Sequence, residues 1–151
     1  MSEQYYGSLR VNNGVKRIEV NDQGECIEIS ANDANFYDRF AEMLRWLNAE
    51  EDKISAFEKE QAEKYGSENT TDRLLDEVKR VTTLYKECAE RIDMIFGKDT
   101  CRKVFGNIVP DEILIGDFLD QITPIISKLA QERGQRFQAK YNRNRKGGKR
   151  K

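Results

Sequence analysis

The sequence predicts a mainly helical fold of the α+β kind, with a long antiparallel helical hairpin, further C-terminal helices and a small N-terminal antiparallel β element. Two observations support this prediction. Apolar residues recur mostly at steps of three and four along residues 36–57 and 74–95, which is the spacing of one face of a helix. Before them, Asn13-Gly14 and Asp22-Gln23-Gly24 separate short apolar runs, and such turns favour hairpins because Asn and Gly tolerate positive φ.

The composition indicates one domain with a thin core. Of 151 residues, 38% are hydrophobic and 35% charged, which is typical of extended helical proteins with much solvated surface. No run approaches the ~18 apolar residues of a membrane span, and no secretory signal is visible, so we expect a cytoplasmic protein. Three widely spaced cysteines argue against a disulfide framework, and the absence of histidine removes the commonest general base and metal ligand.

The charge is divided unevenly along the chain. Residues 133–151 hold nine of the 26 basic residues and no Asp or Glu, so residues 1–132 carry 17 basic against 27 acidic residues. We therefore expect a single acidic folded domain over residues 1–132. Glycines and low apolar content predict a disordered basic tail over 133–151.

The N-terminal β element is predicted within residues 8–30. Leu9–Val11, Val15–Val20 and Glu25–Ile29 are strand-compatible runs, separated by the two turns. We expect a hairpin or a three-stranded meander, which needs a helix over one face to be stable.

Two long helices should follow and lie antiparallel. The first begins at Asn32 or Asp33 and ends at Gly66, and a polar link over residues 67–71 leads into the second. The second carries an uninterrupted apolar stripe of steps four and three over three heptads. A short link between two such helices predicts a helical hairpin that protrudes from the body.

A doubled motif then predicts two sharp corners. Ile95-Phe96-Gly97 is repeated as Val104-Phe105-Gly106, and each glycine is placed to end a helix. Asp99 or Thr100 can cap the short helix between them. We expect the two phenylalanines to be buried. The structural corner therefore consists of Phe96, Gly97, Phe105 and Gly106.

The last predicted helix is the most apolar. Pro110 suits a helix start, with Asp111 and Glu112 in the first turn. Pro124 lies inside this helix and removes a backbone donor, which predicts a kink near Asp120.

Acidic clusters and cysteines are the candidate chemical sites. A magnesium site would use carboxylates of both long helices, but their spacing lacks the paired acidic elements of helical pyrophosphohydrolases, and charge runs on helices are usually solvated faces. Cys101, at a helix start beside Arg102 and Lys103, could be an activated thiol, but without histidine a small buried residue is favoured. We therefore predict no enzyme activity, no metal and no cofactor. The carboxylates are Glu50, Glu51, Asp52, Asp72, Asp76 and Glu77.

Two surfaces are candidates for binding a partner. The basic tail could contact nucleic acid phosphates or an acidic protein, or could act only as a solubilising terminus. The early half of the first helix is apolar on more than one stripe, which predicts either core packing or a docking face for a helical partner. Its candidate partner-binding residues are Phe36, Tyr37, Phe40, Leu44 and Trp46.

The order of these motifs resembles a known family. The chain combines N-D-A-N-F-x-x-R-F at 32–40, I-D-x-I-F-G at 92–97 and T-C-x-K-x-F-G at 100–106 with a following apolar helix and a basic end. Over about residues 16–145 this resembles the tail assembly chaperones of long-tailed, siphovirus-type phages and prophages of Gram-positive bacteria.

The resemblance implies a non-enzymatic protein of the bacterial host cell that binds the helical tape measure protein while the tail tube assembles. The tail tube protein is a second implied partner, a homo-oligomer stays open, and membrane binding is not expected. Two alternatives from other classes remain. One is a nucleic-acid-binding accessory protein acting through the basic tail, although the charge of the acidic body opposes binding to nucleic acid. The other is a helical magnesium-dependent nucleotide pyrophosphohydrolase.

Overall fold

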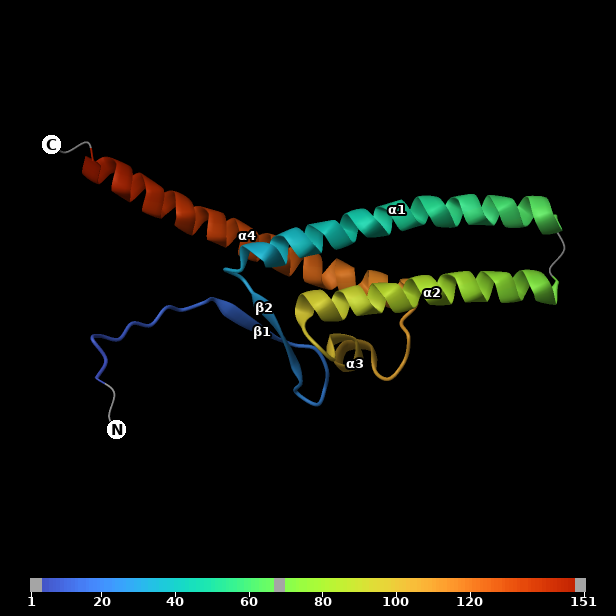
Figure 1. Cartoon of the computed structure of the whole chain (residues 1–151), viewed down its shortest axis with the longest axis horizontal. Helices are drawn as coiled ribbons and strands as arrows, with labels where there is room; N and C mark the ends of the chain where they lie inside the picture. The colour runs from blue at the N-terminus through green and yellow to red at the C-terminus, as the bar shows by residue number, and fades with distance from the viewer. Residues whose placement is uncertain (1–3, 67–69, 149–151) are drawn as a thin grey trace.

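The computed structural model describes residues 4–66 and 70–148, of which 143–148 are described only as backbone. It contains β1 (Val15–Glu19), β2 (Cys26–Ser30), α1 (Ala34–Tyr65), α2 (Thr71–Phe96), α3 (Thr100–Phe105) and α4 (Glu112–Gly148). The helices α1 and α2 form a long hairpin, α4 packs along the end of the hairpin nearest the strands, and half of α4 projects the opposite way (Figure 1). The predicted mainly helical fold with a small antiparallel β element is confirmed.

The β element is a single hairpin. The strands are antiparallel, with Val15 opposite Ser30 and Glu19 opposite Cys26. In the connection, the Asn21 side chain accepts hydrogen bonds from two backbone N–H groups, which fixes the predicted turn. The segment Leu9–Val11 is exposed and forms no third strand, so the hairpin forms and the meander does not. The Asn12 side chain accepts from the Gly14 N–H and the Asn13 side chain from the Val15 N–H, which closes local turns in place of strand pairing.

Local capping sets the ends of the hairpin helices. The Asp33 side chain accepts from the Asn35 N–H at 2.9 Å to begin α1, and the Gly66 N–H donates to the Ala62 carbonyl to end it. Thr70 accepts from the Arg73 N–H to begin α2, and Gly97 ends it with a bond to the Asp93 carbonyl. These boundaries agree with the prediction because each depends on residues adjacent in sequence.

The core lies where β2 and the ends of α1 and α2 nearest the strands meet the first half of α4. Phe96 is at its centre, with ring centroids of Phe36, Phe40 and Phe118 at 5.7, 6.1 and 5.4 Å, all edge to face. Ile27 and Ile29 of β2 are buried against this cluster, so the hairpin closes one side of it. The other buried members are Met43, Cys88, Ile92, Cys101, Ile115, Ile122 and Ile126.

The doubled corner forms with a different cap from the one predicted. Gly97 and Gly106 both have positive φ and end their helices as expected. The Asp99 side chain makes no capping bond, and Asp93 of α2 instead accepts from the Cys101 N–H at 2.9 Å. Phe96 is buried, whereas Phe105 is half-buried and touches Phe118 across 5.9 Å, so the predicted burial holds for the first ring and is partial for the second.

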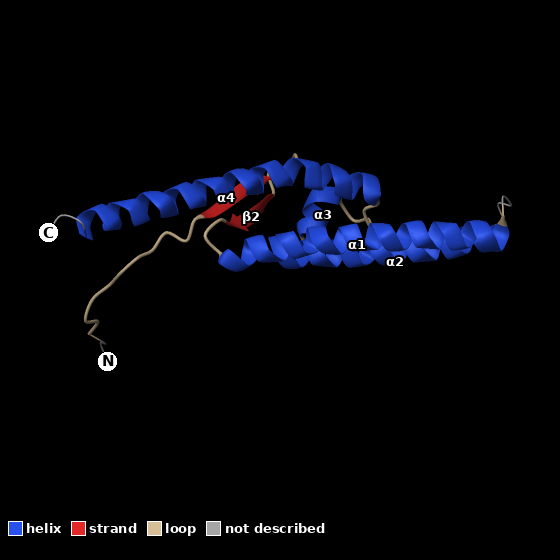
Figure 2. Ribbon diagram, turned by 90° about the horizontal axis from the view of Figure 1, so that it is seen from above, coloured by secondary structure: helices blue, strands red, loops and turns tan. Residues whose placement is uncertain are grey.

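The last helix, α4, starts slightly later than predicted, with Pro110 and Asp111 before its first residue. It begins at Glu112 because the Asp111 carboxylate accepts from the Ile113 and Leu114 N–H groups, and Pro110 lies buried before it. The helix contains Pro124 and is visibly bent along its length (Figure 2), as the prediction of a kink requires.

The prediction of disorder from 133 onward is wrong as far as Gly148, where α4 ends. Residues 135–146 contain no proline and many good helix formers, so the helix continues through Gly134 at a cost of about 1 kcal/mol. Residues 149–151 lie outside the described part of the chain.

Gln61 is a buried polar residue in the hairpin. Its side-chain Oε1 has no hydrogen-bond partner among the described residues. An unsatisfied buried acceptor costs about 1–3 kcal/mol. We expect Gln61→Leu to raise the free energy of unfolding by about 1 kcal/mol, seen as a melting temperature about 2–4 °C higher. Gln138→Leu, on an exposed turn of α4, is the control and should leave the melting temperature unchanged. A lower melting temperature for Gln61→Leu would contradict this reading.

Candidate partner-binding surfaces

The residues predicted to bind a partner lie mainly in the core. Phe36 and Phe40 are buried against Phe96 and are not accessible to another chain. The half-buried Tyr37 donates its hydroxyl to the Ala31 carbonyl at 2.6 Å, which ties α1 to the end of β2. Of the two interpretations that the sequence offered for this face, core packing therefore holds for the two phenylalanines.

Trp46 and Leu44 lie at the edge of the core. Both side chains are half-buried. The Arg91 guanidinium stacks over the Trp46 ring at 4.2 Å and pairs with Glu87 at 3.3 Å. Trp46 is therefore engaged within the hairpin by a cation–π contact.

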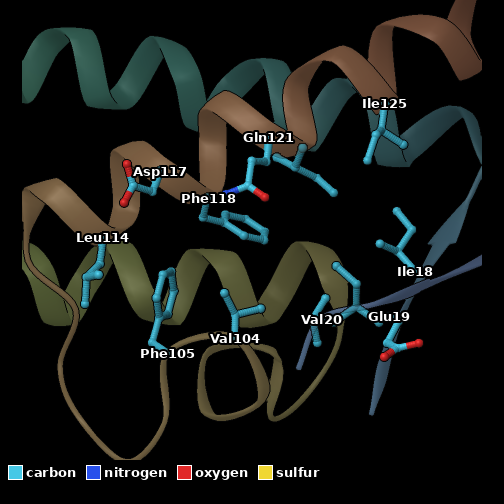
Figure 3. Close-up of a pocket in the computed structure, with 12 residues that line it drawn as sticks. Ile18, Glu19, Val20, Val104, Phe105, Leu114, Asp117, Phe118, Gln121 and Ile125 are labelled. Carbon is cyan, nitrogen blue, oxygen red and sulfur yellow. The ribbon is translucent and has the colours of Figure 1, made fainter. Parts of the chain in front are cut away.

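An open groove lies between β1, α3 and α4, and we call it the β1–α4 groove. It has a volume of about 310 Å³. Figure 3 shows Ile18 and Val20 at one end, Leu114 and Phe105 at the other, and the side chains of α4 above. The remaining lining residues are Glu19, Ile27, Val104, Asp117, Phe118, Gln121, Ile122 and Ile125.

The groove is apolar with an acidic rim. Its only charged lining residues are Glu19 and Asp117, within the described chain. Ile125, one of its walls, is 37% exposed. Three residues between Phe105 and Leu114 in sequence are also exposed, namely Ile108 at 57%, Val109 at 46% and Ile113 at 67%. Apolar surface therefore continues beyond the groove along the start of α4.

The walls of the groove are fixed by bonds between the β-hairpin and α3. The Asn21 side chain donates to the Lys103 carbonyl at 3.0 Å, and the Lys103 ammonium donates to the Cys26 carbonyl at 3.1 Å. Arg102 pairs with Glu25 at 2.9 Å, and this hydrogen-bonded pair lowers the pKa of the Glu25 carboxyl. The turn and the short helix thus hold each other in place, and the groove does not depend on a ligand to form.

A second apolar surface lies at the free end of the helical hairpin. Leu74, Leu75 and Val78 of α2 are 54%, 60% and 49% exposed. They belong to the first turns of α2, and the start of α2 lies in the half of the hairpin that extends beyond the body (Figures 1 and 2). We call these three residues the hairpin tip face.

The candidate chemical sites have structural roles. Burial raises the pKa of the Cys101 thiol to about 12 and that of Cys88 to about 11, so neither is an activated nucleophile. Of the carboxylates considered as magnesium ligands, Glu50 pairs with Lys53, Asp76 with Lys64 and Glu77 with Arg73. In residues 4–66 and 70–148, no three such side chains gather around a common point that could hold a metal ion.

Among the described helices, none combines the length and apolar content that crossing a membrane requires.

Sequence reasoning missed the β1–α4 groove, although one signal was visible. Ile113-Leu114-Ile115 and Ile125-Ile126 are consecutive apolar residues. Consecutive residues lie on different faces of a helix, so they cannot all belong to one buried stripe of α4. In the structure Ile115 and Ile126 are buried, while Leu114 and Ile125 face the groove.

Comparison with known families places most of the chain in one of them. The profile of a family described as "Family of unknown function (DUF6673)" matches residues 23–151. This span contains β2, α3 and α4, which supply most of the groove, and leaves out β1. Searches of curated proteins and of solved structures found no match.

Proposed function

The chain belongs to the DUF6673 family of unknown function, and from its groove and its motifs we propose that it is a phage or prophage tail assembly chaperone. Its client in this proposal is the long helical tape measure protein, with the tail tube protein as a further partner. The proposed place of action is the cytoplasm of the bacterial host cell. The proposal assigns the protein no catalytic activity and no cofactor.

The observation that supports the proposal best is the preformed, open β1–α4 groove. Most of its lining side chains are apolar, and further exposed isoleucine and valine residues continue from it. Contiguous exposed apolar surface on a small protein is characteristic of a binding site for another chain. A chaperone that releases its client needs such a surface in a body that is stable without the client.

A helical client fits the shape and charge of the groove. Its α4 wall runs from Leu114 to Ile125, which is about 17 Å or three turns of helix. An amphipathic helix lying along it would place apolar residues of successive turns against Phe105, Phe118 and Ile125, in the helix-in-groove mode. The rim carboxylates Glu19 and Asp117 favour basic residues flanking the apolar stripe of the client.

The test is co-expression with the tape measure protein and capture through a tag on this chain. We expect Ile125→Arg to weaken capture roughly tenfold or more, because the new charge must be desolvated in the groove. Met94→Arg is the matched control, since Met94 is 75% exposed on α2 and outside the groove. Circular dichroism checks that both variants are folded.

Two outcomes would overturn the proposal. One is that the wild-type chain captures no tape measure protein. The other is that Ile125→Arg and Met94→Arg capture it equally well, which would remove the groove from the interaction.

A further inference from the structure

We propose that this chain self-associates head to tail, with the basic second half of α4 of one copy lying on the hairpin tip face of the next. The client-binding proposal is separate, because it concerns the β1–α4 groove. Two surfaces at opposite ends of the molecule support this proposal. The hairpin tip face has no helix that covers it, and the second half of α4 has no apolar surface to pack against.

The tip of the hairpin lacks a covering helix. The apolar stripe of α2 runs through Leu74, Val78, Tyr85, Cys88 and Ile92, and its exposure falls from the tip, where the first two are about half exposed, to the body, where the last two are buried. At the level of Tyr85 and Cys88 the covering helix is α4. There Ile115 and Leu119 line a cavity of about 170 Å³ with them.

Because α4 begins at Glu112, it covers the stripe no further toward the tip. A second helix placed in line with α4 would cover the rest of the stripe.

The second half of α4 has no apolar surface to rest on. Every residue from Gln131 to Asn142 is exposed. Its base is anchored, since Arg133 lies over the Tyr37 ring at 5.9 Å and Arg136 donates to Asn32. Beyond that anchor, Phe137 and Tyr141 are 67% and 53% exposed, one turn apart on the helix. A lone helix of this length is marginally stable in water, so docking would stabilise it.

Charge and length match between the two surfaces. Residues 133–148 carry six Lys and Arg and no Asp or Glu. The tip, residues 50–66 and 70–85, carries nine Asp and Glu against six Lys and Arg. The stretch of α2 from Leu74 to Tyr85, where the cover by α4 begins, is about 17 Å long, and the exposed helix from Gln131 to Asn142 is about as long. Phe137 and Tyr141 would cover Leu74 and Val78, and the basic residues would face the acidic flanks.

The geometry requires two copies. In both Figure 1 and Figure 2 the second half of α4 and the hairpin tip project in opposite directions, so one chain cannot join its own two surfaces. A contact between unlike surfaces is heterologous, and it builds either a ring or an open chain of copies.

The test is a mixing experiment by sedimentation or light scattering. The hairpin variant is Leu74→Gln with Val78→Gln, and the helix variant is Phe137→Gln with Tyr141→Gln. All four positions are exposed, so both variants should fold. Wild-type protein should exceed the single-chain mass of 17.6 kDa and fall toward it as salt is raised. Each variant alone should remain at the single-chain mass.

An equimolar mixture of the two variants should form a dimer of twice that mass. This follows because the hairpin variant keeps an intact α4 and the helix variant keeps an intact tip. Met94→Gln, which changes an exposed apolar residue of α2 near the body, should associate like the wild type.

Three results would overturn the inference. They are a wild-type protein that stays at the single-chain mass, a variant mixture that forms no dimer, and a helix variant that loses binding to a nucleic acid oligonucleotide while self-association is unchanged. The last would assign the basic helix to nucleic acid.

Discussion

Replacing Phe96 with alanine is expected to lower the free energy of unfolding by about 3–5 kcal/mol. The side chain is 4% exposed, and its ring meets three other rings edge to face. Those rings come from α1 and α4, so one truncation opens a cavity where three helices meet. Aromatic pairs of this geometry also add about 0.5–1.5 kcal/mol each beyond the burial of their area.

The measurement is urea unfolding of Phe96→Ala beside two other phenylalanine variants. Phe105 has a ring contact with Phe118 and is half-buried, so Phe105→Ala should cost clearly less. Phe137 is exposed on α4, and Phe137→Ala should change stability by no more than about 0.5 kcal/mol. The order Phe96, Phe105, Phe137 is the prediction, and a loss below about 1 kcal/mol for Phe96→Ala would show that the ring is peripheral.

The sequence predicted the parts of the fold that depend on neighbouring residues. Gly66, Gly97 and Gly106 end their helices because a glycine tolerates the backbone turn after the last helical residue. Asp33 and Thr70 begin helices because their side chains accept from the next turn. Each of these residues lies within four positions of the helix end that it determines, so the helix end can be predicted without knowledge of the fold.

The predictions that failed depended on distant contacts. The Cys101 N–H is capped by Asp93 from the preceding helix, and local rules offer only Asp99 or Thr100. The wide apolar face of α1 could pack in the core or bind a partner. Phe36 and Phe40 pack in the core because both contact Phe96, which also contacts Phe118 of α4. Sequence periodicity shows that a face is apolar, but not which element covers it.

The candidate surfaces were the least predictable part of the molecule. The β1–α4 groove exists because Asn21 and Glu25 bond to residues about 80 positions later in α3. The hairpin tip face exists because α4 begins too late to cover Leu74 and Val78, although their spacing is the same as that of the buried Cys88 and Ile92. The composition of residues 133–148 suggested disorder, but this segment contains no proline, and in the structure the helix continues through Gly134 despite the high charge.

The protein is expected to lose stability in alkaline solution through its two buried thiols. Burial raises the pKa of Cys88 from 9.0 to about 11 and that of Cys101 from 9.0 to about 12, and Asp93 beside Cys101 adds to the second shift. In the unfolded chain both thiols lose their protons near pH 9, whereas in the folded chain they keep them. The unfolded state therefore binds fewer protons above pH 9, and the free energy of unfolding falls as pH rises.

The pH window and slope follow from those values. The stabilisation is fully present below about pH 9, and each thiol removes about 1.4 kcal/mol per pH unit until the pH reaches its folded pKa. Burial also raises the pKa of Tyr37 and Tyr85, which acts in the same direction at higher pH. We therefore expect the urea midpoint to be constant from pH 7 to about 9 and to fall steeply above it.

Cysteine variants separate the thiols from other alkaline effects. The double variant Cys88→Ala with Cys101→Ala should be less stable at pH 7.5 because it leaves cavities, yet its stability should fall more gently above pH 9. Cys26→Ala is the control, since Cys26 is only half-buried. The stability of this variant should fall above pH 9 with the same slope as that of the wild type. In the native protein a thiol-specific reagent should modify Cys26 first and reach the other two only as the chain unfolds. Equal alkaline slopes for the wild type and the double variant would show that groups other than the buried thiols govern the loss.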